Sequence, residues 1–328
     1  MKRSLVPLLR CPQCSQPVSL VDSRDELAAS EVESGQLLCA GCRAVYPIVH
    51  HIPRFVQSDN YASSFGFQWN RFQRAQLDSH TKTTISRDRF RKSTGWNPES
   101  LTGASVLDVG CGAGRFAEVA LSMDAQVFAV DYSDAVDACW GNLHAHPNLH
   151  VVQADIYALP FQSGSFDYVY CLGVLQHTPD PHTAFLRLPP QLKAGGRLAV
   201  DVYPKPWYHL FYPKYWLRPI TTQMPRPALF RTVERAVPVL LPISRAVGRL
   251  PAVGPLLKRL IPVVNYEGVY PLTEEQLHEW AVLDTFDGLS PAYDRSQTPD
   301  TLRSWLEEAG LKEIELLKAG HLVGRGKK

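Results

Sequence analysis

A glycine-rich turn is the part of the sequence whose residue types point most directly to chemistry. Residues 106–116 read VLDVGCGAGRF and contain Gly110, Gly112 and Gly114. Glycine lets the backbone approach a ligand closely, and a helix after the turn offers unpaired amides at its start. A dinucleotide fingerprint, GxGxxG, would need its third glycine where this chain has Arg115. The spacing and the preceding Asp108 therefore indicate a ligand with an ammonium group rather than a pyrophosphate.

Two more acids end β-rich stretches in the same part of the chain. Asp131 ends QVFAVD, 21 residues after Gly110, and Asp155 ends LHVVQAD. A carboxylate in the position of Asp131 can accept hydrogen bonds from both hydroxyls of a ribose. Because the carboxyl ends of parallel strands meet at one edge of a sheet, we expect Asp108, Asp131 and Asp155 to line one crevice.

The elements that must position these acids alternate in type between residues 101 and 203. Apolar, β-branched stretches alternate with helical ones, which predicts a parallel sheet wound by helices and hence an α/β fold. Further on, Thr298 and Pro299 open a predicted helix that stops at Gly310, and a closing hairpin is expected after it. The predicted strands are SVLDVG, QVFAVD, LHVVQAD, FDYVYCL and RLAVDVY.

A second site is predicted from cysteine spacing. The chain has seven cysteines, and an odd number argues against a disulfide framework. Four of them form two CxxC pairs with 24 residues between, which predicts a structural zinc site because four thiolates close a tetrahedral sphere. The alternatives are four unrelated buried thiols or a redox pair. His50 and His51 are competing ligands in principle, but we expect them within a strand, VYPIVHHIPRF. The predicted ligands are Cys11, Cys14, Cys39 and Cys42.

The motifs resemble those of a known enzyme class. VLDVGCGAGRF, VFAVDYS, ADIYALPF and FDYVYCLGVLQHTPDP are similar, in this order, to the motifs of class I S-adenosylmethionine-dependent methyltransferases, especially the ubiquinone and menaquinone methyltransferase-like group. This resemblance spans residues 101–203. It implies S-adenosylmethionine as cofactor and a Rossmann-like, seven-stranded sheet completed by the terminal hairpin. It also implies contacts to the methionine part from Asp108, Gly110, Gly112 and Gly114, to the ribose from Asp131, to the adenine from Asp155 and Ile156, and to the sulfonium side from Cys171, Leu172 and Gly173.

The N-terminal segment has a resemblance of its own. CPQC, CAGC and the following YPI and IPRF are similar to the zinc ribbon of the small activator proteins of tRNA methyltransferases. RNA binding does not follow from this, because such zinc knuckles occur in many settings. The expected division of the chain is a zinc ribbon at 1–56, a helical lid or linker at 57–100, a methyltransferase core at 101–203, a basic, proline-rich helical cap at 204–297, and the last helix and hairpin of the core at 298–328.

Candidate residues for the transfer step follow the fourth predicted strand. His177 lies where a methyl acceptor could be deprotonated, and histidine suits general-base work near neutral pH. The alternative is a loop histidine that packs against the cofactor, since methyl transfer from a sulfonium needs mainly alignment and exclusion of water. The aromatic and Arg-rich stretch from Phe65 to Trp96 is either a lid or an amphipathic helix on the sheet. A predicted loop that closes on the crevice carries Asp284, Asp287, Tyr293 and Asp294.

Missing motifs narrow the methyl acceptor. The fourth strand is not followed by the DPPY or NPPY run of nucleic-acid amino-group methyltransferases, nor is there the cysteine pattern of 5-methylcytosine enzymes. We therefore expect transfer to an oxygen or carbon of a small molecule. An RNA methyltransferase that uses the ribbon and the basic cap remains an alternative, as does a non-enzymatic cofactor-binding scaffold.

Charge and hydropathy limit which binding partners and which cellular compartment we expect. The formal net charge is +2, but the stretch from Tyr203 to Pro262 has ten Lys or Arg against one acid, Glu234, and eleven prolines. We expect this stretch to be broken into short helical pieces that either cover an apolar substrate or rest on an anionic membrane surface. A folded cap with merely solvated charges is the alternative. With no predicted transmembrane segment and no export signal, the expected location is the cytoplasm.

Overall fold

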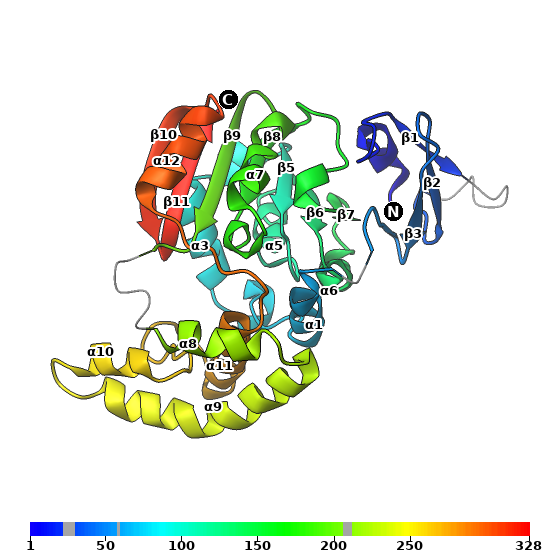
Figure 1. The fold of residues 1–328 in the computed structure, drawn as a ribbon. Helices are drawn as coiled ribbons and strands as arrows, with labels where there is room; N and C mark the ends of the chain where they lie inside the picture. The colour runs from blue at the N-terminus through cyan, green and yellow to red at the C-terminus, as the bar shows by residue number, and fades with distance from the viewer. Residues whose placement is uncertain (22–29, 58–59, 206–211) are drawn as a thin grey trace.

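The computed structural model describes residues 1–21, 30–57, 60–205 and 212–328, so parts of the expected ribbon and cap lie outside the described residues. It contains a four-stranded sheet, in the order β1-β2-β3-β4, and a seven-stranded sheet, in the order β10-β11-β9-β8-β5-β6-β7 (Figure 1). Strands β9, β8, β5, β6 and β7 run parallel, whereas β11 is antiparallel to both of its neighbours. The predicted seven-stranded sheet with a hairpin at its end is confirmed.

The large sheet matches the predicted strands closely. The five parallel strands end at or within two residues of the expected positions, and β9 begins five residues earlier than expected because it extends through Lys193–Gly196. Their bounds are β5 Ser105–Val109, β6 Gln126–Asp131, β7 Leu149–Gln153, β8 Phe166–Cys171 and β9 Leu192–Val202; the hairpin strands are β10 Lys312–Ala319 and β11 His321–Lys327.

Helices cover both faces of this sheet because the strands are apolar on both sides. One face packs on α3 (Ile85–Thr94), α5 (Arg115–Leu121) and α6 (Ala135–Leu143). The other face packs on α7 (Pro181–Leu186) and α12 (Pro299–Glu308). The predicted start of α12 is confirmed: the Thr298 side chain accepts a hydrogen bond from the Thr301 amide at 3.2 Å. The result is a three-layer α/β/α core.

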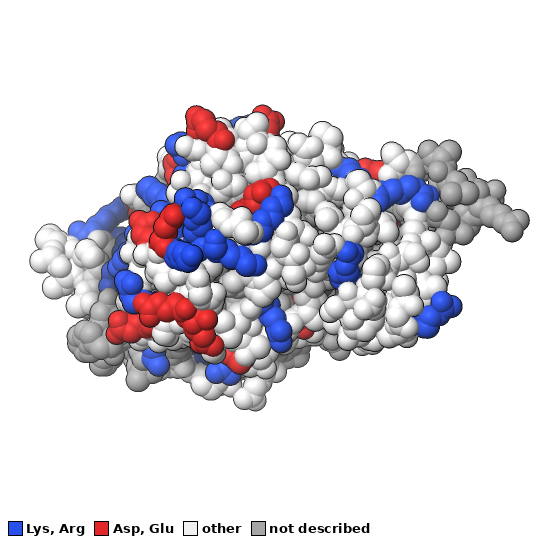
Figure 2. All heavy atoms as spheres, turned by 90° about the horizontal axis from the view of Figure 1, so that it is seen from above, with Lys and Arg blue, Asp and Glu red and all other residues white. Residues whose placement is uncertain are grey.

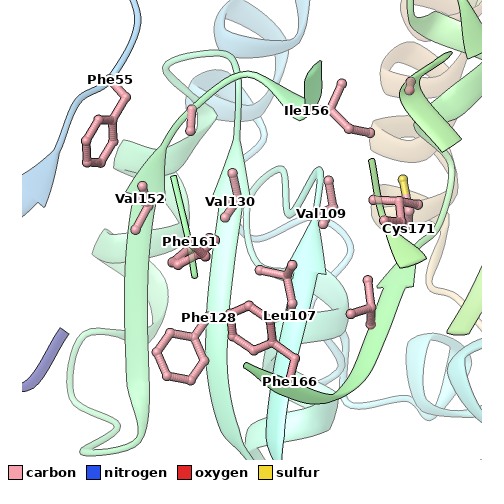
Figure 3. Packing of buried hydrophobic residues seen from close by; sticks show 14 of the residues in the cluster. Phe55, Leu107, Val109, Phe128, Val130, Val152, Ile156, Phe161, Phe166 and Cys171 are labelled. Atoms are coloured by element: carbon pink, nitrogen blue, oxygen red, sulfur yellow. The ribbon is translucent and has the colours of Figure 1, made fainter. Parts of the chain in front are cut away.

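The second face has a continuous aromatic and aliphatic core (Figure 3). Leu107 of β5 and Phe128 of β6 point to the same side of the sheet, and Phe128 packs edge to face on Phe166 with ring centroids 5.2 Å apart. Phe55, which follows the small sheet, lies beside Val152 at the edge of the large one. The two sheets therefore share one hydrophobic core.

The small sheet and a short N-terminal turn of 3-10 helix, Arg3–Leu8, form the ribbon. Arg54 lies in a parallel bridge with Gln153 at the end of β7, and the Phe55 amide donates to the Gln153 carbonyl at 2.8 Å. The Arg54 guanidinium donates to Gln153 Oε1 at 2.8 Å and to Asp137 Oδ1 at 2.6 Å. An edge strand exposes unpaired backbone groups, and here the ribbon covers that edge. The strands of the ribbon are β1 Val18–Val21, β2 Gly35–Cys39, β3 Val45–Val49 and β4 Ile52–Pro53.

Between ribbon and core, the chain forms short helices, and after β9 it forms the cap, which lies below the carboxyl ends of the parallel strands (Figure 1). In the cap, α9 packs along α11 through an apolar cluster that includes Phe230, Val237 and Phe286. The helices before the core are α1 Ser63–Arg71, α2 Asp78–Thr81 and α4 Pro98–Leu101, and those of the cap are α8 Pro213–Thr221, α9 Arg226–Gly248, α10 Gly254–Leu257 and α11 Glu274–Leu289.

The prediction that prolines break the cap into short pieces is wrong for α9, which runs unbroken for 23 residues. Pro238 and Pro242 are both exposed and lie four residues apart, hence on one side of the helix. The carbonyls that lose a backbone donor, those of Glu234 and Pro238, lie on this same outer side, where water can bind them. The helix bends (Figure 1) instead of ending. None of the helices that the structure describes is long and apolar enough to cross a membrane.

Candidate functional site

A cavity of about 380 Å³ lies at the carboxyl edge of the parallel strands. Its floor is formed by the turns after β5, β6 and β8. Its walls come from α1 and α3 before the core and from α8 and α11 of the cap. The cavity therefore lies where ligands bind in open α/β sheets. Of the predicted site residues, it is lined by Gly110, Gly112, Asp131, Ile156, Leu172, Gly173 and His177.

The glycine turn has a backbone shape that other residues would resist. Gly110 has φ +85°, and a Cβ there would lie 2.2 Å from a methyl carbon of Val174. Gly112 has φ +53°, and the indole nitrogen of Trp69 would lie 3.1 Å from its Cβ. Gly114 differs: it lies outside the cavity lining, and a Cβ there would meet Leu143 of α6 at 2.6 Å. Two of the three glycines thus face the cavity, and the third allows α5 and α6 to approach.

Asp131 connects the turns after β5 and β6. Its Oδ2 accepts from the Gly112 amide at 2.9 Å, and its Oδ1 accepts from the amide and hydroxyl of Ser133 at 2.8 and 2.7 Å. Burial raises the pKa of Asp131, and these hydrogen bonds oppose the rise. Oδ1 already accepts two hydrogen bonds, whereas Oδ2 accepts one and has a further lone pair. The side chain is therefore held in place and can still accept hydrogen bonds from a ligand.

The other two acids lie outside the cavity lining. Asp108 is 2% exposed, and its Oδ2 has no hydrogen-bond partner within the described part of the chain. Burial raises the pKa of Asp108 to about 8, a value that a nearby cation would lower. Asp155 caps the short 3-10 turn Ile156–Ala158 by accepting from the Tyr157 amide at 3.0 Å. Of the three acids that were predicted to line one crevice, only Asp131 thus lines the cavity.

The turn after β8 is held by a buried ion pair. Cys171 is fully buried, whereas Leu172 and Gly173 line the cavity. The Gly173 amide donates to Asp201 at the end of β9, and Arg89 of α3 donates to the same carboxylate at 2.9 Å. Asp201 also lies 3.2 Å from His321 Nδ1. The pair therefore joins α3, β9 and the hairpin beside Gly173.

His177 lies in the cavity wall in one fixed orientation. Its Nδ1 lies 3.0 Å from the Tyr293 carbonyl oxygen, which can only accept, so Nδ1 carries the proton. The ring packs between Phe65 and Tyr203, with centroids 5.1 and 5.3 Å away. Burial lowers the pKa of His177, which keeps the ring neutral near pH 7. Its Nε2 bonds to no described residue and is free to accept a proton.

Acids of the cap face the same cavity. The prediction that Asp284 and Asp287 lie in a loop is wrong, because both lie on α11, which Thr273 and Gln276 start with a capping box and which continues past Gly288. Asp287 accepts a hydrogen bond from the side-chain amide of Gln68 at 3.2 Å. Burial raises the pKa of Asp284 to about 6. The other two predicted residues, Tyr293 and Asp294, do lie between helices, where Asp294 pairs with Lys214 at 2.7 Å.

Several cavity residues were not identified from the sequence. Arg115 is half-buried and donates to Ser86 and Gln76 at 2.9 and 2.7 Å, and desolvation lowers its pKa to about 10. Arg89 and Trp69 belong to the stretch identified as a lid or packing helix, but nothing in it singled them out. Three aromatic residues of the cap have no recognisable spacing: Tyr266, Tyr270 and Trp280.

The four cysteines of the two CxxC pairs come together in the ribbon. All four sulfur atoms lie within 4.8 Å of one another, with Cys11 to Cys42 at 3.6 Å and Cys14 to Cys39 at 3.3 Å. Zinc–sulfur bonds of about 2.3 Å at tetrahedral angles put sulfur atoms about 3.8 Å apart. The Gly41 amide lies 3.3 Å from the Cys39 sulfur, as expected for backbone donors around a thiolate. The cluster therefore fits a tetrahedral metal ion.

The two histidines near this cluster lie outside it. We predicted a continuous strand through His50 and His51, which is wrong: they form the turn between β3 and β4, with φ +49° and +65°. Positive φ angles of this kind suit a tight hairpin connection. The His51 ring stacks on Trp140 of α6 at 5.1 Å between centroids, so it contacts the core.

Comparisons with known proteins divide the chain in the same way. Residues 107–200 match the family model of a methyltransferase domain, and residues 2–50 match that of Trm112p-like proteins. Similar curated proteins are the ubiquinone biosynthesis O-methyltransferases of Xanthomonas oryzae pv. oryzae (39% identity, 30% of this chain and 42% of the relative) and Albidiferax ferrireducens (37%, 29% and 40%). The O-methyltransferase cnsE of Penicillium expansum is 32% identical over 34% of this chain and 43% of that protein. The chain thus spans about two fifths of the length of these relatives.

Solved structures with similar folds include a Haloferax volcanii complex that contains the Trm112 methyltransferase activator, with 15% identity, coverage of 83% of this chain and 98% of that one, and a TM-score of 0.45. Human N-acetylserotonin methyltransferase has 13% identity, coverage of 82% and 56%, and a TM-score of 0.41. The stronger indications are the two family matches, the strand order and the cysteine cluster. The chain therefore contains a methyltransferase domain at residues 107–200 and a Trm112p-like segment at residues 2–50, and the strand order and the cysteine cluster agree with these two matches.

Proposed function

We propose that this protein transfers a methyl group from S-adenosylmethionine to an oxygen or carbon of a small-molecule acceptor. The observation that carries the proposal is the cavity at the carboxyl edge of the sheet. The Gly112–Asp131 turn and the free Nε2 of His177 line this one cavity. When bound, the cofactor supplies an electrophilic methyl group on a sulfonium. All other requirements, which are orientation, exclusion of water and removal of a proton, fall to residues of the chain.

Residues on the floor of the cavity fit the cofactor. Asp131 would accept hydrogen bonds from the ribose hydroxyls, with Asp155 and Ile156 toward the adenine. The orphaned carboxylate of Asp108 would be stabilised by the ammonium of the amino-acid end. That end also carries a carboxylate, and Arg89 and Arg115 are half-buried guanidiniums in the cavity lining that can bind it. Gly110, Gly112, Leu172 and Gly173 line the cavity and would shape the remaining contacts, whereas Gly114 and Cys171 would act from behind the lining.

An oxygen acceptor is favoured by the state of His177. A hydroxyl must lose its proton as it gains a methyl group, and a neutral imidazole with a free Nε2 can take it. Phe65 and Tyr203, which flank His177, also line the cavity, so an aromatic or otherwise flat acceptor would pack against these rings. The names of the similar curated proteins, which are O-methyltransferases, agree with this choice.

The ribbon is proposed as a structural zinc site with ligands Cys11, Cys14, Cys39 and Cys42. Four thiolates leave no open position for water or substrate, so the metal would take no part in methyl transfer. We propose that residues 1–56 are the ribbon and that residues 57–100 complete the cavity as a lid. Residues 101–203 and 298–328 would then be the core, and residues 204–297 the cap.

The experiment uses the purified protein with labelled S-adenosylmethionine and a cell extract separated into small-molecule and RNA fractions. We expect label to enter a small molecule and to be stable to ribonuclease. Label that enters RNA alone would replace this function with the RNA alternative. An absence of label in every fraction, with normal cofactor binding, would favour the non-enzymatic scaffold.

A further inference from the structure

The cap carries most of the exposed apolar side chains of the molecule. Among the described residues, thirteen large hydrophobic side chains are exposed, and ten of them lie between Trp216 and Val269. Leu256 is 66% exposed and Val253 51%. Scattered single apolar residues are ordinary on a protein surface, but a concentration on one element marks an interaction site. The cap therefore has a surface that its own fold does not cover.

These side chains gather at one end of the cap. The inner face of α9 packs on α11, and the outer face carries Val239. The chain then folds back: the Gly254 amide donates to the Leu250 carbonyl at 3.0 Å, and α10 lies against the end of α9 (Figure 1). We call this end, residues 239–260, the cap tip. Its exposed apolar residues are Val239, Ile243, Leu250, Val253, Leu256, Leu257 and Leu260.

Positive charge surrounds the cap tip. Lys258 and Arg259 lie within it, and Arg231 and Arg235 lie on the preceding turns of α9. No ion pair links any of these four to another described residue. The other two basic residues of the tip, Arg245 and Arg249, are paired with Glu274 and Glu267 at 2.7 and 2.5 Å, and Glu234 is paired with Arg71 at 3.2 Å. The four unpaired basic side chains are therefore available to a partner of negative charge.

The opposite face of the molecule is different. Figure 2 shows it from above, with basic and acidic side chains side by side. On that side Lys193 pairs with Asp167 at 2.9 Å, and Arg197 pairs with Glu313 at 3.2 Å. Lys312 and Lys318 of the hairpin also form no ion pair with a described residue, so what distinguishes the cap tip is the combination of unpaired basic residues with exposed apolar side chains.

We infer that the cap tip docks on the surface of an anionic lipid bilayer. Apolar side chains that enter the headgroup boundary, combined with unpaired lysines and arginines, are what peripheral binding to such a surface requires. None of the described helices can cross a membrane, so the contact lies on the surface. On the inner side of α9, α11 contributes Asp284 and Asp287 to the cavity. Docking would thus leave two helix layers, α9 and α11, each about 10 Å thick, between the headgroups and the cavity.

The experiment measures partition of the full-length protein onto vesicles of phosphatidylcholine, with or without about 30 mol % phosphatidylglycerol. We expect binding to the anionic vesicles that weakens with salt, and little binding to the neutral ones. Val253→Glu combined with Leu256→Glu should abolish it. Lys258→Gln combined with Arg259→Gln should weaken binding to the anionic vesicles about 30-fold, because each basic residue near the surface increases the affinity about fivefold.

Matched controls use exposed residues far from the cap. Val45→Glu places a charge on an exposed valine of the ribbon, and Lys312→Gln with Lys318→Gln removes two charges from the hairpin. These variants should bind vesicles as the unchanged protein does. All variants should keep their melting temperature and their affinity for S-adenosylmethionine, so the test is independent of the proposed enzyme activity.

Three outcomes would overturn the inference. One is equal binding to neutral and anionic vesicles. Another is a Val253→Glu, Leu256→Glu variant that binds like the unchanged protein. The third is a dimer in sedimentation that this same variant dissociates, which would make the cap tip an interface between two copies of the chain.

Discussion

The Nδ1 atom of His177 lies 3.0 Å from the carbonyl oxygen of Tyr293, a residue 116 positions further along the chain. This contact fixes the tautomer, because a carbonyl can only accept the proton. It also links the turn after the fourth parallel strand to the segment between α11 and α12. The reactive nitrogen is thus oriented by the cap, which the core strands alone would not achieve.

Replacing His177 should separate chemistry from binding. We expect His177→Gln to lower the rate of methyl transfer about 10²- to 10⁴-fold, since a positioned base contributes that much, while affinity for S-adenosylmethionine is kept. His146→Gln, an exposed histidine, is the control. Product formation by mass spectrometry is the measurement. An unchanged rate would assign His177 a packing role only.

The pH dependence of the same reaction has a definite direction. Burial lowers the pKa of His177 from its ordinary value of 6.5, so the base is already neutral at pH 7. The rate should therefore be flat near pH 7 and fall only below about 6.5, as the imidazole becomes protonated. Initial rates across pH 5 to 8 in the unchanged protein, compared with His177→Gln, check this. A limb above pH 7 would point to a different titrating group.

Asp131 should control cofactor binding. Loss of a hydrogen bond between a carboxylate and a ribose hydroxyl removes roughly 1.5–3 kcal/mol, so Asp131→Ala should weaken the binding of S-adenosylmethionine about 10- to 150-fold. Isothermal titration calorimetry measures this directly. Glu307→Ala, an exposed acid on α12, should bind the cofactor normally. Equal affinities in the two variants would contradict the cofactor assignment.

Removal of the metal should act through the ribbon. We expect Cys39→Ser to release zinc, to expose residues of β1 to β4 to hydrogen exchange and to leave the seven-stranded sheet folded. The measurements are metal content by atomic emission and hydrogen exchange by mass spectrometry. Cys139→Ala alters a cysteine of α6 outside the cluster and should keep the metal. A metal-free Cys39→Ser ribbon with unchanged protection would argue against a structural metal.

The buried pair of Arg89 and Asp201 should matter for stability. Burial alone would raise the pKa of Asp201, but the charges of His321 and Arg89 hold it well below its ordinary 3.8. The contribution of this carboxylate is therefore present above pH 3.8 and is lost as the pH falls further, when the acid becomes protonated in the native state. Asp201→Asn leaves a buried arginine unpaired and should cost about 3–5 kcal/mol at pH 7.

Urea unfolding checks this value against a surface pair. Asp167, whose side chain is 37% exposed, pairs with Lys193 at 2.9 Å, and Asp167→Asn should cost only about 0–1 kcal/mol. A similar decrease in the free energy of unfolding in the two variants would mean that the Arg89–Asp201 pair stabilises the fold no more than a solvent-exposed pair does.

The strands and the metal cluster could be predicted from sequence because their signals are local. Apolar β-branched runs define β5 to β8, and the spacing within each CxxC pair already brings two thiols together. The glycine turn was equally local. Asp131 was found because strand order determines which turn lies beside it.

The rest of the site depends on contacts between segments that are distant in sequence. Arg89 lies near Asp201, 112 residues later, and nothing around either residue announces the pairing. The length of α9 was missed because proline was expected to break the helix. At exposed positions of a packed helix, proline need not break it. Asp284 and Asp287 were assigned to a loop, yet α11 packs against α9 and continues through both residues to Leu289.

Arg54 and Gln153 show what the ribbon gains from sharing a chain with the core. Their contact, and the shared hydrophobic core beside it, would have to form by association if the ribbon and the core were two separate proteins. A tether makes the docking intramolecular, so the effective concentration of the ribbon at the β7 edge is in the millimolar range however dilute the protein is. The edge is then occupied at every expression level, and the stoichiometry of ribbon to core is always one to one. A ribbon cut free between residues 56 and 60 would instead have to find its partner by mass action, and dilution alone would uncover the edge.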